Sequence, residues 1–230
     1  MERIKSYAEE INQINLNPYF ISLSKQDFPL TKFLQSQEGF IEAVNCWTHV
    51  LCKLVFILPS DQERIPVIMN LYDEHGEGNP QNTHIQTFTR FLQNLGYIGK
   101  IEIGKASPSH RICRNFTSAL NKSFEKADKD YQYMSALLGM IEYTYITVSH
   151  NIHLYAVGFV DAKDIEHYSL HEILDTKHSE DLFRLCLDKE GRMNDDDQER
   201  VFSGMKEGYD IFYTLYSELA SITLPTTTSE

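Results

Sequence analysis

The sequence predicts an all-α protein, a single helical bundle of seven to eight helices over residues 1–230. Apolar residues recur at intervals of three and four along nearly the whole chain, which is the period of a helix and not of a strand. Helix-breaking residues divide this pattern into segments of ordinary helix length. Neither an internal repeat nor a domain linker interrupts it. With 42% hydrophobic residues, the chain can bury one sizeable core.

The first three expected helices cover residues 4–14, 31–58 and 62–72. The first is short and has apolar residues at helical spacing on one side. The second is apolar on more than one side, which indicates a largely buried helix, and Pro59 ends it. In the third, Pro66 is tolerated because it lies near the first turn.

The middle of the chain predicts a helix over 80–95, which the pair Asn79-Pro80 opens and Gly96 ends. Residues 98–108 are expected to form a loop or a short extended piece. Two further helices follow, over 109–126 and 128–149.

The last two expected helices begin at acidic or amide residues. Asp161 is expected to cap a long helix that runs to Leu187. Asn194 and the run Asp195–Asp197 predict the start of the final helix, where acidic side chains suit the helix dipole. Residues 224–230 are expected to be frayed.

The charge and the cysteines limit the partners and the compartment. A net charge of -12 argues against nucleic acid and against attachment to anionic lipid. The longest apolar run, over 50–59, contains Lys53 and is too short for a membrane span. The polar N-terminus lacks the apolar core of a signal peptide. The four cysteines have no Cys-x-x-Cys spacing, so we expect reduced thiols in a cytoplasmic protein.

The motif that carries chemistry is His171, Asp175 and His178, at positions i, i+4 and i+7. On an α-helix these three side chains share one narrow stripe. Two imidazoles and a carboxylate on one stripe offer half of a metal site. The alternative is a solvated polar face with one i,i+4 pair.

Two other segments could complete the site. Glu74 at the end of one helix and His84 at the start of the next could aim at one centre, since the intervening glycines allow a sharp connection. Glu77 is a rival for Glu74, although its glycine neighbours favour a solvated turn. Glu142 lies in an apolar run, where a lone carboxylate is costly unless it is paired or bound to a metal ion.

Together these segments offer three carboxylates and three histidines, which are too many for one structural zinc ion. They suit two divalent ions, because helix bundles build di-iron sites from inward-facing Glu and His side chains. The three carboxylates would neutralise three of the four positive charges. The six candidate ligands are Glu74, His84, Glu142, His171, Asp175 and His178.

These motifs resemble those of the haem-oxygenase-like di-metal oxidases, which are iron-containing redox enzymes with the fold of TenA and PqqC. The resemblance runs from about Tyr19 to Phe183. It includes the segment from Asn70 to Glu74 with its following glycines and His84, then Glu142, then the motif that starts at His171. It also includes the segment that begins Gln37-Glu-Gly-Phe.

The resemblance implies a haem-oxygenase-like bundle in which all six residues bind two Fe(II) ions, the second of them often labile. O2 would be the co-substrate. It also implies oxidation of a small organic molecule, such as an amino acid or an amine, by nitrile formation, N-oxygenation or oxidative C–C cleavage in specialised biosynthesis. One subgroup makes p-aminobenzoate from its own Tyr and Lys. Here Tyr19-Phe20 and Asn151-Ile152 stand near those positions, so that activity is not expected.

Other polar residues have two readings each. Glu42, in the apolar middle of a helix, could bind a substrate amine or act as a further ligand, or it could pair with a Lys or Arg. Tyr145 shares the face of Glu142 and is a candidate for the substrate pocket. Asp73 could support a ligand histidine or could simply lie near a helix end. His167 could lie behind the ligands, or at a surface or cap.

Two other functions fit the same fold. A cofactor-free TenA-type hydrolase would need a nucleophilic cysteine with a nearby glutamate. A non-catalytic binding protein would keep the bundle without turnover, but the intact set of candidate ligands argues against it. The partner that we expect is a small-molecule substrate, with a homodimer as an open option and with neither nucleic acid nor membrane.

Overall fold

The computed structural model describes residues 1–188 and 190–223, and every regular element in that part of the chain is helical. The all-α prediction is therefore confirmed. The α-helices are α1 (Glu2–Ile11), α2 (Pro18–Ser24), α3 (Leu30–Glu38), α4 (Ile41–Ile57), α5 (Asp61–Glu74), α6 (His84–Asn94), α7 (Pro108–Ala127), α8 (Tyr131–Ala156), α9 (Glu166–Arg184) and α10 (Asp195–Ala220). The short 3-10 helices are η1 (Ile14–Leu16), η2 (Gly76–Gly78) and η3 (Ala162–Asp164).

The number of helices exceeds the expected seven or eight for two reasons. The helix expected over 31–58 is two helices, α3 and α4, which are separated at Gly39-Phe40. A short helix, α2, was not predicted; Asn17 caps it by accepting a hydrogen bond from the backbone N–H of Tyr19.

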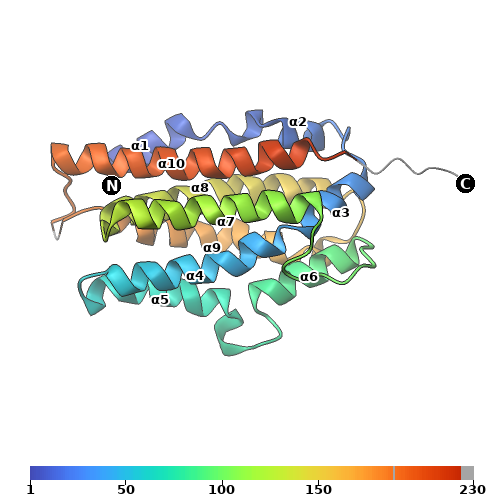
Figure 1. Ribbon diagram of the computed structural model, residues 1–230, viewed down its shortest axis with the longest axis horizontal. Helices are drawn as coiled ribbons and strands as arrows, with labels where there is room; N and C mark the ends of the chain where they lie inside the picture. Colours follow the sequence, from blue (N-terminus) through green and yellow to red (C-terminus); the bar gives the residue numbers. More distant parts are fainter. Residues whose placement is uncertain (189, 224–230) are drawn as a thin grey trace, which may run out of the picture.

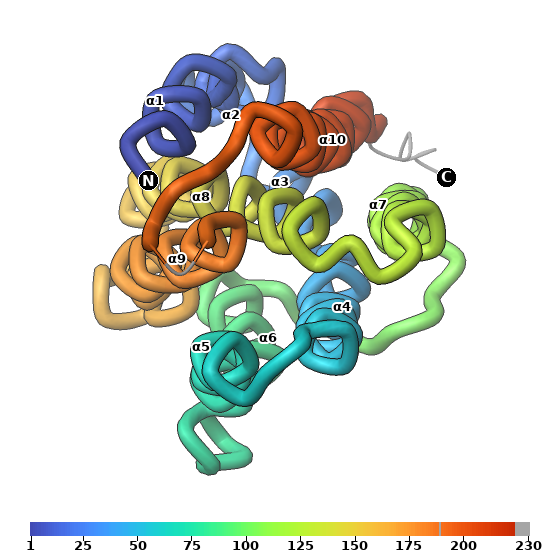
Figure 2. The backbone as a smooth tube through the Cα atoms, turned by 90° about the vertical axis from the view of Figure 1, so that its left-hand side faces the viewer, coloured from blue at the N-terminus to red at the C-terminus, as the bar shows by residue number. Residues whose placement is uncertain are grey.

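The long helices run roughly parallel to the longest axis of the molecule (Figure 1). Helices α1 and α2 lie along α10 on one side, and α4, α5 and α6 form the opposite side. The end-on view in Figure 2 shows these helices arranged around the bundle axis. Helix α8 packs against α9 and α10, and most of its side chains are buried.

Two glycines allow the close packing of α8. A Cβ atom at Gly139 would lie 2.8 Å from Cδ1 of Phe183 on α9. A Cβ atom at Gly208 on α10 would lie 2.3 Å from the carbonyl oxygen of Leu137. Larger residues at these two positions would force α9 and α10 away from α8.

The helical stretch Leu30–Ile57 is long and apolar enough, with a mean hydropathy of 1.4, to resemble a membrane span. In this fold the stretch is interrupted between α3 and α4, and its side chains Val50, Leu51 and Leu54 are fully buried. Because α4 packs against α5 and α7, it is a core helix of the bundle.

Two helix starts differ from the prediction. Helix α6 begins at His84 and not at Pro80, because Asn79 opens a turn in which its side chain accepts a hydrogen bond from the N–H of Gln81. Asp161 precedes η3, and the long helix α9 begins only at Glu166. Both differences shorten a helix by several residues without moving its candidate ligands off it.

Helix α8 runs to Ala156, beyond the expected end at 149, and α9 ends at Arg184, before Leu187. Several other boundaries agree with the prediction. Gly96 follows the end of α6 with a φ of +92°, which favours glycine. The side chain of Asn194 caps α10 by accepting a hydrogen bond from the N–H of Asp197. The expected loop over 98–108 forms no regular element before α7 begins. The expected frayed end at 224–230 lies outside the described residues.

Candidate metal centre

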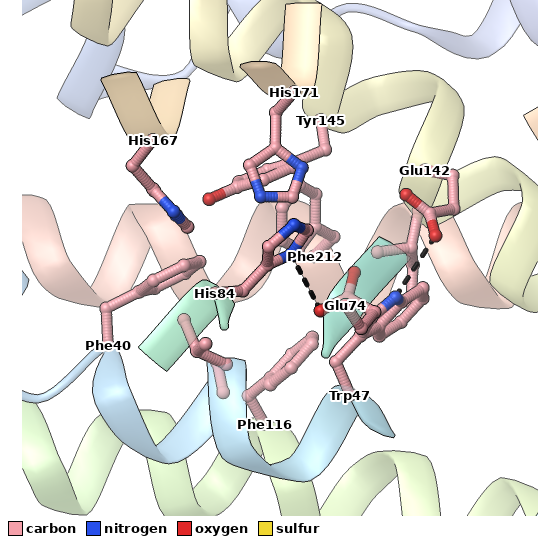
Figure 3. A pocket seen from close by; sticks show the side chains of 13 residues that line it. Phe40, Trp47, Glu74, His84, Phe116, Glu142, Tyr145, His167, His171 and Phe212 are labelled. Atoms are coloured by element: carbon pink, nitrogen blue, oxygen red, sulfur yellow. Dashed lines mark hydrogen bonds and ion pairs between the residues drawn. The ribbon is translucent and has the colours of Figure 1, made fainter. Parts of the chain in front are cut away.

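All six candidate ligands are buried and lie close together in the middle of the bundle. Four helices supply them, so the cluster depends on the tertiary fold. Figure 3 shows Glu74, His84, Glu142 and His171 around one cavity. Asp175 and His178 are on the same face of α9 as His171.

Glu142, Asp175 and His178 form the most compact group, since one possible ligand atom from each lies within 4.8 Å of the others. Nδ1 of His178 is 3.6 Å from Oδ1 of Asp175 and 4.0 Å from Oε1 of Glu142. Among the described residues this buried nitrogen has no hydrogen-bond partner. An orphaned imidazole nitrogen beside two carboxylates is the donor set that a divalent iron ion takes.

Glu74, His84 and His171 form a second group next to the first. Oε2 of Glu74 is 2.7 Å from Nδ1 of His84, and the rings of His84 and His171 are 4.5 Å apart. Within residues 1–188 and 190–223, Nε2 of His84 has no hydrogen-bond partner although it is buried. Asp175 links the two groups, because its Oδ1 is 3.0 Å from Nδ1 of His171.

Three neighbouring side chains orient the candidate ligands. Oδ2 of Asp73 is 3.0 Å from Nε2 of His178, which leaves Nδ1 facing the carboxylates. Trp47 and Asn70 both donate to Oε1 of Glu142, at 3.1 and 3.0 Å, so that Oε2 stays available. Asp73 therefore supports a histidine, which was one of its two predicted roles.

The electrostatics of the compact group favour a bound cation. Burial and the negative charge of Asp175 raise the pKa of Glu142 to about 8. Burial lowers the pKa of His178, but the neighbouring carboxylates of Asp175, Glu142 and Asp73 outweigh burial and raise it to about 9. The pKa of Asp175 is lowered, because His171 and His178 outweigh the effect of burial. Without a metal ion, protons on Glu142 and His178 thus offset the repulsion within this group. A divalent ion could take the place of these protons.

The other predicted residues fall into place differently. Glu77 is exposed on η2, so its rival claim to the site fails. Glu42 is buried away from the cavity lining, and its carboxylate accepts hydrogen bonds from the N–H of Gly104 at 2.7 Å and from Arg114 at 3.0 Å. Of the predicted roles of Glu42, pairing with an arginine agrees with these contacts. Tyr145 lines the cavity, with its ring 4.9 Å from that of His171.

Sequence reasoning missed Trp47 and Asn70 as supporting residues. Asn70 precedes Glu74 by four residues, so its position on the same helix face was a signal that could have found it. Trp47 gave no local signal, because its partner Glu142 is 95 positions away in the sequence.

The cavity beside the candidate ligands is small and mostly apolar. Its volume is about 50 Å³, whereas a single water needs about 10–15 Å³. In the part of the chain that the structure describes, no Lys, Arg or Cys lines it. Its apolar wall is formed by Phe40, Ala43, Val44, Phe116, Ile141 and Phe212.

The fold and the cluster define a class, that of helical bundles whose facing helices bury carboxylates and histidines as the iron-carboxylate proteins do. The family model described as iron-containing redox enzyme matches residues 43–213, and this chain belongs to that family. The predicted resemblance is confirmed.

A solved structure shares the fold. It is the crystal structure of a CADD-like protein of unknown function from Nostoc punctiforme, with a TM-score of 0.71 and 16% sequence identity. The match covers 96% of this chain and 98% of that chain. No curated protein matches the sequence.

Proposed function

We propose that this protein is a cytoplasmic non-haem di-iron oxidase or oxygenase, which uses O2 to oxidise a small amino acid or amine in specialised biosynthesis. The observation that carries the proposal is the buried set of three carboxylates and three histidines. Two imidazole nitrogens of this set are buried without a hydrogen-bond partner in the described part of the chain. Membership of an iron-containing redox family supports iron as the metal.

Two Fe(II) ions are the proposed cofactors. Glu142, Asp175 and His178 would hold one ion, and Glu74, His84 and His171 would hold the other. The three carboxylates balance three of four positive charges, which keeps the centre electrophilic. Fe(II) bound there would supply the redox chemistry that activates O2, and the substrate would supply the remaining electrons.

The chain's own residues orient and enclose the reaction. Trp47 and Asn70 fix one oxygen of Glu142, and Asp73 fixes the ring of His178. The apolar wall excludes water and holds the hydrocarbon part of a substrate. Because the described cavity lining offers no Lys or Arg to a free carboxylate, an amine suits it without further adjustment. Nitrile formation, N-oxygenation and oxidative C–C cleavage all act on substrates of this kind.

The cofactor-free hydrolase is less well supported, because no cysteine of the described residues lines the cavity. Burial raises the pKa of Cys46 and that of Cys113 above the ordinary value, which disfavours the thiolate that such a reaction needs.

The test is anaerobic loading with Fe(II), measurement of iron per chain, and exposure to O2 with a panel of amino acids and amines. We expect two irons per chain and O2 consumption that one class of compound accelerates. His171→Ala and Glu142→Ala should each lower the iron bound per chain, whereas His49→Ala, at an exposed position, should not. Absence of bound iron in the wild type would revive the hydrolase, and iron without O2 consumption would favour a binding protein.

A further inference from the structure

His167 is a buried cavity residue that the six candidate ligands do not account for. It lies in the first turn of α9, one helical turn before His171, and is 1% exposed. Its ring lines the cavity beside the rings of His84 and His171, with centroids at 5.8 and 4.7 Å (Figure 3).

The hydrogen bonds of Thr87 determine which nitrogen of His167 carries the proton. Oγ1 of Thr87 donates its single proton to the carbonyl oxygen of His84, at 3.1 Å. The same oxygen lies 2.9 Å from Nδ1 of His167, so it accepts a hydrogen bond there. Nδ1 therefore carries the proton, and Nε2 carries a lone pair. Across residues 1–188 and 190–223, nothing hydrogen-bonds to that buried Nε2.

The surroundings of His167 differ from those of the candidate ligands. It forms no ion pair with any carboxylate of the described chain, whereas the three candidate ligand histidines, His84, His171 and His178, all do. Phe88 and Tyr168 flank its ring, with centroids at 5.3 and 5.0 Å. His167 thus lines the cavity without belonging to either group of candidate ligands.

We propose that Nε2 of His167 is a hydrogen-bond acceptor that selects substrates carrying an N–H or O–H group on a small apolar body, primary amines above all. This inference rests on the proposed function and deepens it by naming a specificity-determining residue. A buried acceptor without a partner is costly, and a donor on the substrate removes that cost. A molecule that can only accept hydrogen bonds leaves Nε2 unpaired and is rejected.

The chain has a built-in reporter for the test. Trp47 is its single tryptophan, it lines the cavity, and its indole N–H is bonded to Glu142. Quenching or shift of its fluorescence therefore measures binding without turnover. The probes are n-butylamine, 1-butanol and methyl propyl ether, which have the same number of heavy atoms, and only the first two are donors.

We expect wild-type protein, both metal-free and anaerobic with Fe(II), to bind the two donors about tenfold more tightly than the ether. His167→Phe should abolish this preference and leave iron per chain unchanged. His167→Gln keeps an acceptor and should restore part of the preference. His49→Phe, at an exposed position, is the matched control and should behave as wild type.

Three results would overturn the inference. Wild-type protein that shows no preference, or that binds none of the probes, removes its basis. A preference that persists in His167→Phe means that another group, such as the metal, recognises the donor. Loss of iron in His167→Phe makes His167 a metal ligand. If the wild type binds no iron, the proposed function fails, while the metal-free titration still decides the role of His167.

Discussion

Glu142→Gln should stabilise the metal-free protein while weakening its hold on iron. The carboxyl group of Glu142 has its pKa raised from 4.5 to about 8 by burial and by Asp175. A carboxyl group whose pKa is higher in the folded state does not change the free energy of unfolding below pH 4.5. As the pH rises from 4.5 toward 8, it lowers the free energy of unfolding more and more. Between pH 4.5 and pH 7 the cost reaches about 3 kcal/mol, at 1.36 kcal/mol for each pH unit.

Glutamine removes this cost with little change in shape. Its carbonyl oxygen can accept the hydrogen bonds of Trp47 and Asn70 that Oε1 of Glu142 now accepts. Its amide group, unlike a carboxylate, is not repelled by Asp175. At pH 7 the free energy of unfolding of the variant should therefore exceed that of wild type by up to about 3 kcal/mol, which raises the denaturant midpoint. The two proteins should have the same stability near pH 4.5.

The assay is urea unfolding in the presence of a chelator, between pH 4.5 and pH 8, followed by circular dichroism. Glu125→Gln on α7, at an exposed position, is the matched control and should not differ from wild type. With saturating Fe(II) the order should reverse, because only the wild type gains the stabilisation of a tightly bound ion, about 4 kcal/mol at a thousandfold excess over Kd. A variant that is no more stable than wild type at pH 7 without metal would refute the electrostatic reasoning.

Four further predictions follow from the same geometry. Trp47→Phe removes one of two donors to Glu142 and should weaken Fe(II) binding about tenfold in a chelator competition; unchanged affinity would count against it. Because the pKa of His178 is about 9 and that of Glu142 about 8, iron binding at pH 7 should release about two protons, and the affinity should rise up to pH 9. Calorimetry in buffers of different ionisation enthalpy measures this, and release of less than one proton contradicts it. Glu42→Gln should lower stability by about 1–3 kcal/mol with iron per chain unchanged; a parallel loss of iron would tie Glu42 to the centre. Stepwise Fe(II) titration should show two phases, and Glu74→Gln should remove only the weaker one; loss of the tighter phase would reverse the assignment.

The candidate ligands could be predicted from the sequence because each carries a local signal. His171, Asp175 and His178 have the spacing of one helix face, and Glu142 is a carboxylate in an otherwise apolar run. The glycines before His84 indicate a turn that brings it back toward Glu74. The structure places all of these side chains in one buried cluster, as the prediction required.

The supporting residues could not be predicted, because their partners are distant in the sequence. Trp47 can donate a hydrogen bond to Glu142 only because the fold places α4 beside α8. Glu42 had two readings, and the contact with Arg114, 72 positions away, is what separates them. His167 had two readings, behind the ligands or at a surface or cap, because nothing near it in the sequence reveals that Thr87 lies against its ring.

The backbone predicts that the two proposed iron sites differ in affinity. Glu142 stands on α8, and Asp175 and His178 stand on α9. Gly139, three residues before Glu142, allows these two helices to approach each other closely. Those candidate ligands therefore stand on two long helices that pack closely against each other.

Glu74 and His84 instead stand at the end of α5 and the start of α6. The segment between them is largely exposed and has three successive residues with positive φ, Gly76, Glu77 and Gly78. A segment with few buried contacts opens at a lower free energy than packed helices do. Binding of an ion by Glu74 and His84 would have to order that segment, so we expect the iron proposed for this second site to be the more weakly bound of the two.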